Sequence, residues 1–123
     1  MTDNEEKPLN WQVYLFYFFL VLFILFSNLV FSQITIKSFN AGWNESNNVE
    51  WLNKLSDVKT ISYVDIGEDS EAQKKYKIAV VPTVIIFKDG EEVARFQADL
   101  SFKMVATKEE IQEEIDEQLM SDF

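Results

Sequence analysis

At 123 residues the chain has room for one small domain, and its net charge of −10 comes from 21 acidic and 11 basic side chains. This balance argues against nucleic acid as a partner, because phosphate binding needs clustered Lys and Arg. Cysteine and histidine are both absent. The chain therefore lacks a thiolate nucleophile, a disulfide, a Cys/His zinc site and a Ser-His-Asp relay. We expect no catalytic residue, no metal and no cofactor.

Residues 1–10 form an acidic tail, and an uncharged apolar run, VYLFYFFLVLFILF, follows from Val13 to Phe26. As a helix, residues 11–32 would reach about 33 Å, enough to cross a hydrocarbon core of about 30 Å. We therefore predict a transmembrane helix over residues 11–32, acting as an uncleaved signal anchor. The protein would be a single-pass membrane protein whose globular part, residues 33–123, lies outside the cytoplasm, because the segment is N-terminal and signal-like.

The alternative for this segment is a secretory signal peptide. Val30-Phe31-Ser32 precedes Gln33, and a small residue at position 32 suits cleavage after it. Cleavage would release a secreted soluble domain. Against cleavage, the apolar run is longer than the usual 7–15 residues of a signal peptide, and the tail before it is acidic.

The first half of the globular part shows strand and helix patterns in alternation. Residues 34–39 alternate with β-branched side chains and predict a strand. A loop rich in Asn and Gly follows, and an asparagine at its end can cap a helix that runs to about residue 56. A second strand is expected over residues 59–65, and a short helix over residues 70–76.

The second half contains stronger local signals. Val81-Pro82-Thr83 leads into an apolar strand at residues 84–87, and Asp89-Gly90 is typical of a two-residue hairpin turn. The partner strand covers residues 92–97. Thr107 begins the last helix, with a glutamate three residues later completing a capping box. The expected order is β-α-β-α-β-β-α.

This order, together with the segment VPTVIIFKDGEEVARF, resembles the thioredoxin family over Ile34 to Met120. The resemblance implies an α/β thioredoxin-like fold with a mixed central sheet and a cis proline at Pro82. It also implies a departure from the family. The family's W-C-G-P-C motif corresponds to Trp43-Asn44-Glu45-Ser46-Asn47, so both cysteines are asparagines. The family's buried acid corresponds to Ser38. We therefore expect no thiol–disulfide oxidoreductase activity, since exchange needs two thiols.

In the thioredoxin family the backbone before the cis proline pairs with an extended partner peptide. The resemblance therefore implies a peptide or protein groove, with Trp43, Asn44, Asn47, Val81 and Pro82 as its residues. The other interpretation is that Pro82 only preserves the turn. Asn44-Glu45-Ser46 also matches a glycosylation acceptor, a pattern that is common by chance.

Asp99 to Met104 lengthens the connection to the last helix relative to the family. Leu100, Phe102 and Met104 alternate along this stretch. The pattern indicates either an apolar edge for a partner or a connector that covers the edge of the sheet.

We expect a membrane-anchored, redox-inactive interaction module or accessory subunit of a membrane protein complex. Its partners would be protein, and membrane lipid through residues 11–32, with no small-molecule substrate evident. The alternative function is a chaperone-like or redox-assisting factor that presents clients to a separate thiol oxidoreductase.

Overall fold

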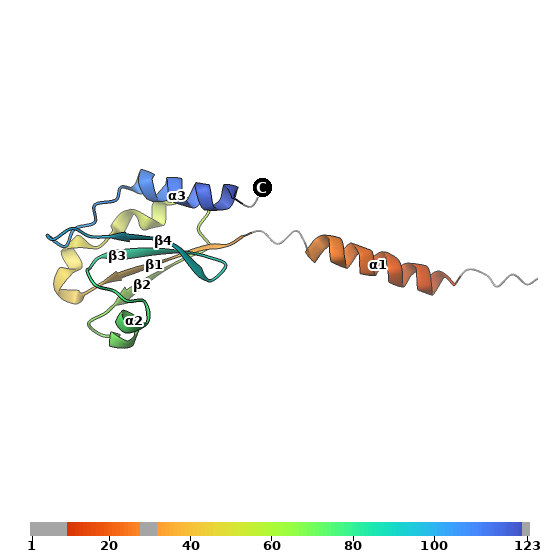
Figure 1. Cartoon of the computed structure of the whole chain (residues 1–123), viewed down its shortest axis with the longest axis horizontal. Helices are drawn as coiled ribbons and strands as arrows, with labels where there is room; N and C mark the ends of the chain where they lie inside the picture. The colour runs from red at the N-terminus through yellow and green to blue at the C-terminus, as the bar shows by residue number, and fades with distance from the viewer. Residues whose placement is uncertain (1–9, 28–31, 122–123) are drawn as a thin grey trace, which may run out of the picture. The chain divides into compact units, whose positions relative to one another are not determined.

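The computed structural model describes residues 10–27 and 32–121, and the chain divides into two compact units, Met1–Phe31 and Ser32–Phe123 (Figure 1). The first unit holds one described helix, α1. The second holds a four-stranded sheet with helices on both of its faces.

Helix α1 spans Trp11–Ser27, with the Gln12 N–H donating to Asn10 Oδ1 at 3.0 Å at its start. Its 17 residues reach about 26 Å, short of a hydrocarbon core of about 30 Å. Within residues 10–27 and 32–121, none of the helices combines the length and the apolar character needed to cross a bilayer. The predicted single-pass membrane localisation is therefore wrong, and the described residues do not show the transmembrane helix predicted over residues 11–32. Residues 28–31, which include part of the predicted cleavage motif, lie outside the described residues.

The sheet of the second unit has the strand order β2-β1-β3-β4. Strand β1 (Ile34–Asn40) runs parallel to β2 (Thr60–Asp65) and antiparallel to β3 (Thr83–Lys88), which pairs antiparallel with β4 (Glu91–Gln97). Strand β3 is central and apolar on both faces, so nearly all of it is buried. The predicted mixed sheet is confirmed.

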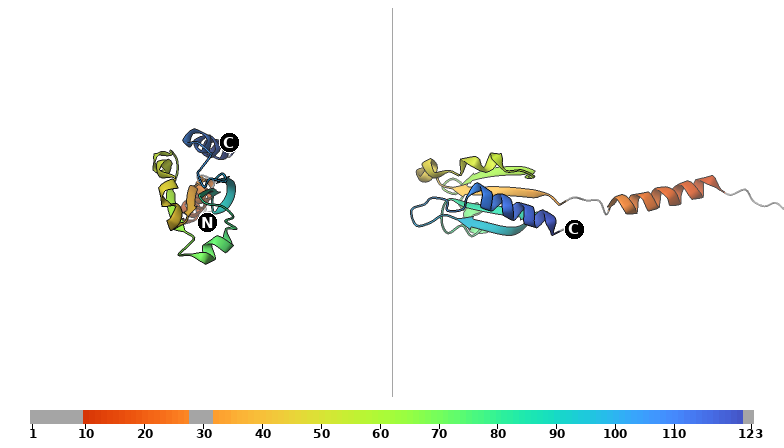
Figure 2. Two further views of the ribbon diagram at one scale, coloured as in Figure 1. Left: turned by 90° about the vertical axis from the view of Figure 1, so that its left-hand side faces the viewer. Right: turned by 90° about the horizontal axis from the view of Figure 1, so that it is seen from above.

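Each face of the sheet carries its own hydrophobic core. Ile34 and Ile36 of β1 point to the face covered by α3 (Lys108–Met120), where they meet Ile111 and Ile115. Phe39 and its neighbours point to the opposite face, where α2 (Ser70–Lys75) packs. The period-two alternation of β1 therefore builds both layers. Figures 1 and 2 show α3 and α2 on opposite sides of the sheet.

The segment after β1 differs from the prediction. Instead of one α-helix ending near residue 56, it forms two 3-10 helices, η1 (Gly42–Asn47) and η2 (Glu50–Lys54). Asn48 (φ −58°, ψ 144°) and Val49 (φ −82°, ψ 92°) separate them with non-helical backbone angles. Asn and Ser side chains compete for backbone hydrogen bonds and so disfavour a regular helix.

The predicted hairpin turn and the Thr107 cap are confirmed, whereas the return bond from the Glu110 side chain that a capping box needs is not formed among the described residues. Asp89 and Gly90 both have positive φ, 52° and 87°, as a primed hairpin turn requires. Thr107 caps α3, its Oγ1 accepting from the Glu110 N–H at 3.1 Å. Helix α2 (Ser70–Lys75) begins at the predicted residue, and the Asp69 carboxylate caps it by accepting from the Ala72 N–H at 3.0 Å.

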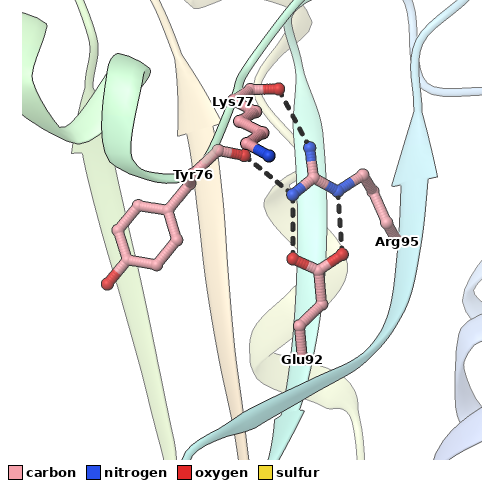
Figure 3. Close-up of polar contacts among 4 residues, drawn as sticks. All are labelled: Tyr76, Lys77, Glu92 and Arg95. Atoms are coloured by element: carbon pink, nitrogen blue, oxygen red, sulfur yellow. Dashed lines mark hydrogen bonds and ion pairs between the residues drawn. The ribbon is translucent and has the colours of Figure 1, made fainter.

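A bulge in β4 sets up a clamp between β4 and the end of α2. Ile86 pairs with Ala94 whereas Phe87 pairs with Glu92, so one extra residue lies between. Glu92 and Arg95 are therefore on the same face of the sheet, although three residues apart. They form a two-bond ion pair, at 3.0 and 2.8 Å (Figure 3).

Arg95 also forms hydrogen bonds with two backbone carbonyl oxygens at the end of α2. Lys77 has a left-handed φ of 52°, and the Ile78 N–H donates to Gln73 O at 2.9 Å, as in a Schellman cap. The guanidinium donates to Tyr76 O at 2.7 Å and to Lys77 O at 3.1 Å (Figure 3). Arg95 thus fixes the beginning of the loop that leads to Pro82.

The clamp predicts a stability difference between two charge-removing variants. Arg95→Gln removes the donors to both carbonyls and should lower the free energy of unfolding by about 2 kcal/mol. Glu92→Gln leaves those two bonds intact and should cost less than about 1 kcal/mol. Urea unfolding followed by tryptophan fluorescence measures both, and equal losses would contradict the role given to the carbonyl bonds.

Candidate functional site

The predicted site begins at η1, directly after β1. Asn44 lies there with non-helical backbone angles, φ −112° and ψ 20°, and the residue is almost entirely buried, at 3% exposure. A buried amide is costly unless its hydrogen bonds are made. The asparagines of this segment form these hydrogen bonds with one another and with the backbone carbonyl of Phe102.

Four asparagine side chains form one network, which we call the asparagine network: Asn40, Asn44, Asn47 and Asn48. Asn44 Nδ2 donates to Asn40 Oδ1 at 3.1 Å and to Phe102 O at 3.0 Å, and Asn44 Oδ1 accepts from Asn47 Nδ2 at 2.7 Å. Asn40 Nδ2 donates to Asn44 O at 3.0 Å and to Asn48 Oδ1. Both amide hydrogens of Asn44 are used, so the glycosylation pattern at this residue is buried in the fold.

The insertion between β4 and α3 reaches this network through Phe102. The Asp99 carboxylate accepts from the Ser101 N–H at 2.8 Å, the Ser101 hydroxyl at 2.5 Å and the Lys103 N–H at 3.2 Å. The Ser101 hydroxyl contributes most, followed by these backbone donors, to holding the pKa of the Asp99 carboxyl below its ordinary value. Phe102 has a left-handed φ of 63°, unfavourable for a bulky residue, and the Asp99 turn holds it there.

Phe102 contacts η1 with its ring as well as with its carbonyl. The rings of Phe102 and Trp43 meet edge-on, with centroids 5.0 Å apart at 90°. Trp43 is nevertheless 69% exposed. Leu100 is 98% exposed, while Met104 packs against the core of the α3 face. The alternation at Leu100, Phe102 and Met104 therefore does not build one apolar edge.

A pocket of about 330 Å³, which we call the Trp43 pocket, lies beside these rings. Trp43 and Phe102 line it, as do Ile78, Ala79 and Val81 of the loop before β3. Its lining is largely apolar, and its volume lies at the low end of the range of about 300–1,000 Å³ for ligand sites.

Val81 lines this pocket and directly precedes an unusual peptide bond. The Val81–Pro82 peptide bond is cis, as the resemblance implies. Two hydrogen bonds hold it: Ala98 N–H donates to Pro82 O at 3.0 Å on its C-terminal side, and the Thr83 hydroxyl donates across it to Val80 O at 2.6 Å. Within the described part of the chain, neither the N–H nor the C=O of Val81 forms a hydrogen bond.

The structure thus divides the five predicted site residues into two groups. Trp43 and Val81 line the same pocket, whereas Asn44 and Asn47 belong to the asparagine network. Pro82 is fully buried. Sequence reasoning missed the parts played by Asn40 and Asn48. Their spacing around Asn44, four residues before and four after, was the available signal.

Among residues 10–27 and 32–121, no cluster of acidic side chains has the arrangement of a metal site. Where the resemblance places two thiols, the structure has two amides that bond each other. The arrangement supports binding chemistry through aromatic contacts and unpaired backbone groups.

Comparison with known proteins shows what the second unit is similar to. No protein-family profile matches the chain. A thioredoxin of Chlamydia pneumoniae is 47% identical over 36 residues, 29% of this chain and 35% of that protein, so the match spans little more than a third of its length.

Solved structures resemble a larger share of the chain. A single-site mutant of the thioredoxin from Halobacterium salinarum matches with a TM-score of 0.57 at 21% identity, covering 71% of this chain and 75% of that one. A malaria parasite thioredoxin-2, described as a component of that parasite's protein secretion machinery, matches with a TM-score of 0.54 at 16% identity, covering 70% and 84%. The predicted thioredoxin-like fold is confirmed.

The asparagine network predicts that an isosteric change at its centre is costly. Asn44→Asp replaces the donor that serves Asn40 Oδ1 and Phe102 O with an oxygen, which places a carboxylate against two acceptors. The free energy of unfolding at pH 7 should fall by about 3 kcal/mol. Asn53→Asp makes the same charge change at an exposed position and should lower it by less than about 0.5 kcal/mol. Urea unfolding of both variants provides the comparison, and similar losses would show that the network carries little stability.

Proposed function

We propose that this chain is a redox-inactive thioredoxin-like domain that binds an extended segment of a protein partner in the Trp43 pocket. One observation carries the proposal: two exposed aromatic side chains line the same pocket as a residue whose backbone N–H and C=O form no hydrogen bond in the described chain. Trp43 and Phe102, whose rings contact each other, line the pocket together with Val81, whose peptide groups form no hydrogen bond in the described chain.

Redox inactivity rests on the chemistry of the two amides. Exchange with a substrate disulfide needs one thiolate to attack and a second thiol to resolve the mixed disulfide. Asn44 and Asn47 stand where the resemblance places those groups, and an amide supplies neither. The Asn44 amide is moreover fully engaged in the asparagine network.

Binding rests on two complementary contributions. An extended segment that paired with Val81 would satisfy its N–H and C=O, in the manner of an added strand. An apolar side chain of the same segment would cover Trp43 and Phe102, which now expose aromatic surface to water. Exposed tryptophan is favoured at interfaces because it buries a large area on binding.

Peptide selection tests the proposal. The full chain, kept in non-ionic detergent because α1 exposes apolar side chains, would be presented to a library of random dodecapeptides. Selected peptides should be linear, should protect the Val81 amide from hydrogen exchange, and should bind Trp43→Ala about 30-fold more weakly.

Leu100→Ala is the matched control, because Leu100 lies in the insertion next to the pocket but is almost fully exposed. It should leave the affinity unchanged within about twofold. Peptides that bind wild type and Trp43→Ala equally, or a library without any enriched peptide, would overturn the proposal.

A further inference from the structure

A second pocket lies at the ends of the parallel strands β1 and β2, and we call it the Ser38 pocket. It has a volume of about 320 Å³ and is lined by Ser38, Gly42, Glu45, Tyr63 and Asp65, with Asn40 and Asn48 of the asparagine network at its wall. The crevice beyond the carboxyl ends of parallel strands is where α/β sheets commonly bind ligands.

Ser38 gives this pocket an unused hydrogen-bonding group. The residue is 4% exposed, on the central strand β1, paired with Tyr63 on β2 and Val84 on β3. Its hydroxyl forms no hydrogen bond with any described residue. Among the described residues, every fully enclosed side-chain nitrogen or oxygen has a partner, so the Ser38 hydroxyl must be reached from the pocket. A ligand that bonded it would satisfy a nearly buried polar group.

The charged groups of the pocket are all of one sign. Glu45 and Asp65 line it, no basic side chain does, and neither carboxylate forms an ion pair with a described residue. Asp65 Oδ1 accepts from the Gly67 N–H at 2.8 Å. Its other oxygen, Oδ2, faces Gly42, where a Cβ would lie 3.5 Å away, so the glycine leaves space beside that oxygen.

We propose that the Ser38 pocket binds the cationic side chain, lysine or arginine, of the partner segment that occupies the Trp43 pocket. That the ligand belongs to the partner segment rests on the proposed function. That the ligand is cationic rests on the lining of the Ser38 pocket. The two pockets share Ala41, and Asp65 of one is followed directly by Ile66 and Gly67 of the other. Side chains of an extended segment alternate in direction, so neighbouring residues reach both pockets. The partner segment is therefore basic as well as apolar.

Nuclear magnetic resonance with single-residue probes tests the pocket apart from the peptide groove. The ¹⁵N-labelled full chain in non-ionic detergent is titrated with N-acetyl-lysine methylamide, N-acetyl-arginine methylamide and, as the neutral control, N-acetyl-norleucine methylamide. Either cationic probe should shift the amide signals of Ser38, Tyr63 and Asp65 with a Kd on the order of millimolar. The shifts should shrink at high salt, because screening weakens the attraction between exposed charges.

Matched variants assign the effect to the pocket. Glu45→Gln combined with Asp65→Asn keeps the bond to Gly67 while removing both charges, and should weaken lysine binding by at least roughly fivefold. Glu50→Gln removes one exposed charge on η2 and should leave binding unchanged. Ser38→Ala should weaken it by a smaller factor.

Equal shifts with norleucine, or unchanged lysine binding in the double variant, would overturn the inference. So would the absence of any shift at Ser38, Tyr63 and Asp65. The proposed function fails by a different result, namely selected peptides that ignore Trp43, so the two outcomes are distinguishable.

Discussion

The asparagine network is the constraint on which the rest of the site depends. Asn44 is buried at the position where the resemblance places the family's first thiol, and three hydrogen bonds of its side chain make that burial tolerable. The bond to Phe102 O joins η1 to an insertion 58 residues further along the chain. A position that resembles a reactive site therefore holds two segments together, and the aromatic pair of Trp43 and Phe102 follows from that connection.

The loop between α2 and β3 lines the Trp43 pocket, and its two ends are fixed by separate interactions. Arg95 holds the carbonyls at the end of α2, where the loop toward Pro82 begins, and Ala98 N–H binds Pro82 O where it ends. Opposite this loop, the Asp99 turn keeps Phe102 in its left-handed conformation. The Val81 backbone is thus held in place without being paired within the described chain. Backbone groups fixed in this way would lose little conformational entropy if they paired with the proposed partner segment.

Local signals predicted the parts of the fold that depend on few residues. The Asp89-Gly90 turn, the Thr107 cap and the apolar strand β3 required only short-range chemistry, and the thioredoxin-like order followed from them. After β1, the Asn and Ser content signalled a disfavoured helix but not its replacement by two 3-10 helices. The clamp at Arg95 could not be predicted, because it depends on a bulge in β4 and on bonds to the end of α2. For α1, the apolar run and a helix assumed over residues 11–32 suggested a span that the length of the described helix does not provide. At the site, the resemblance to the thioredoxin family suggested Trp43 and Val81, but only tertiary contacts revealed Phe102 as their neighbour.

The central claim is that Asn44 is a structural residue locked in a hydrogen-bonded network. Hydrogen exchange of its side-chain NH₂ group, followed by nuclear magnetic resonance, tests this directly, with the exposed Asn53 as an internal reference. The account predicts that both Asn44 side-chain protons exchange at least roughly a hundredfold more slowly than those of Asn53, because exchange requires the network to open. Exchange of Asn44 at the rate of Asn53 would contradict it.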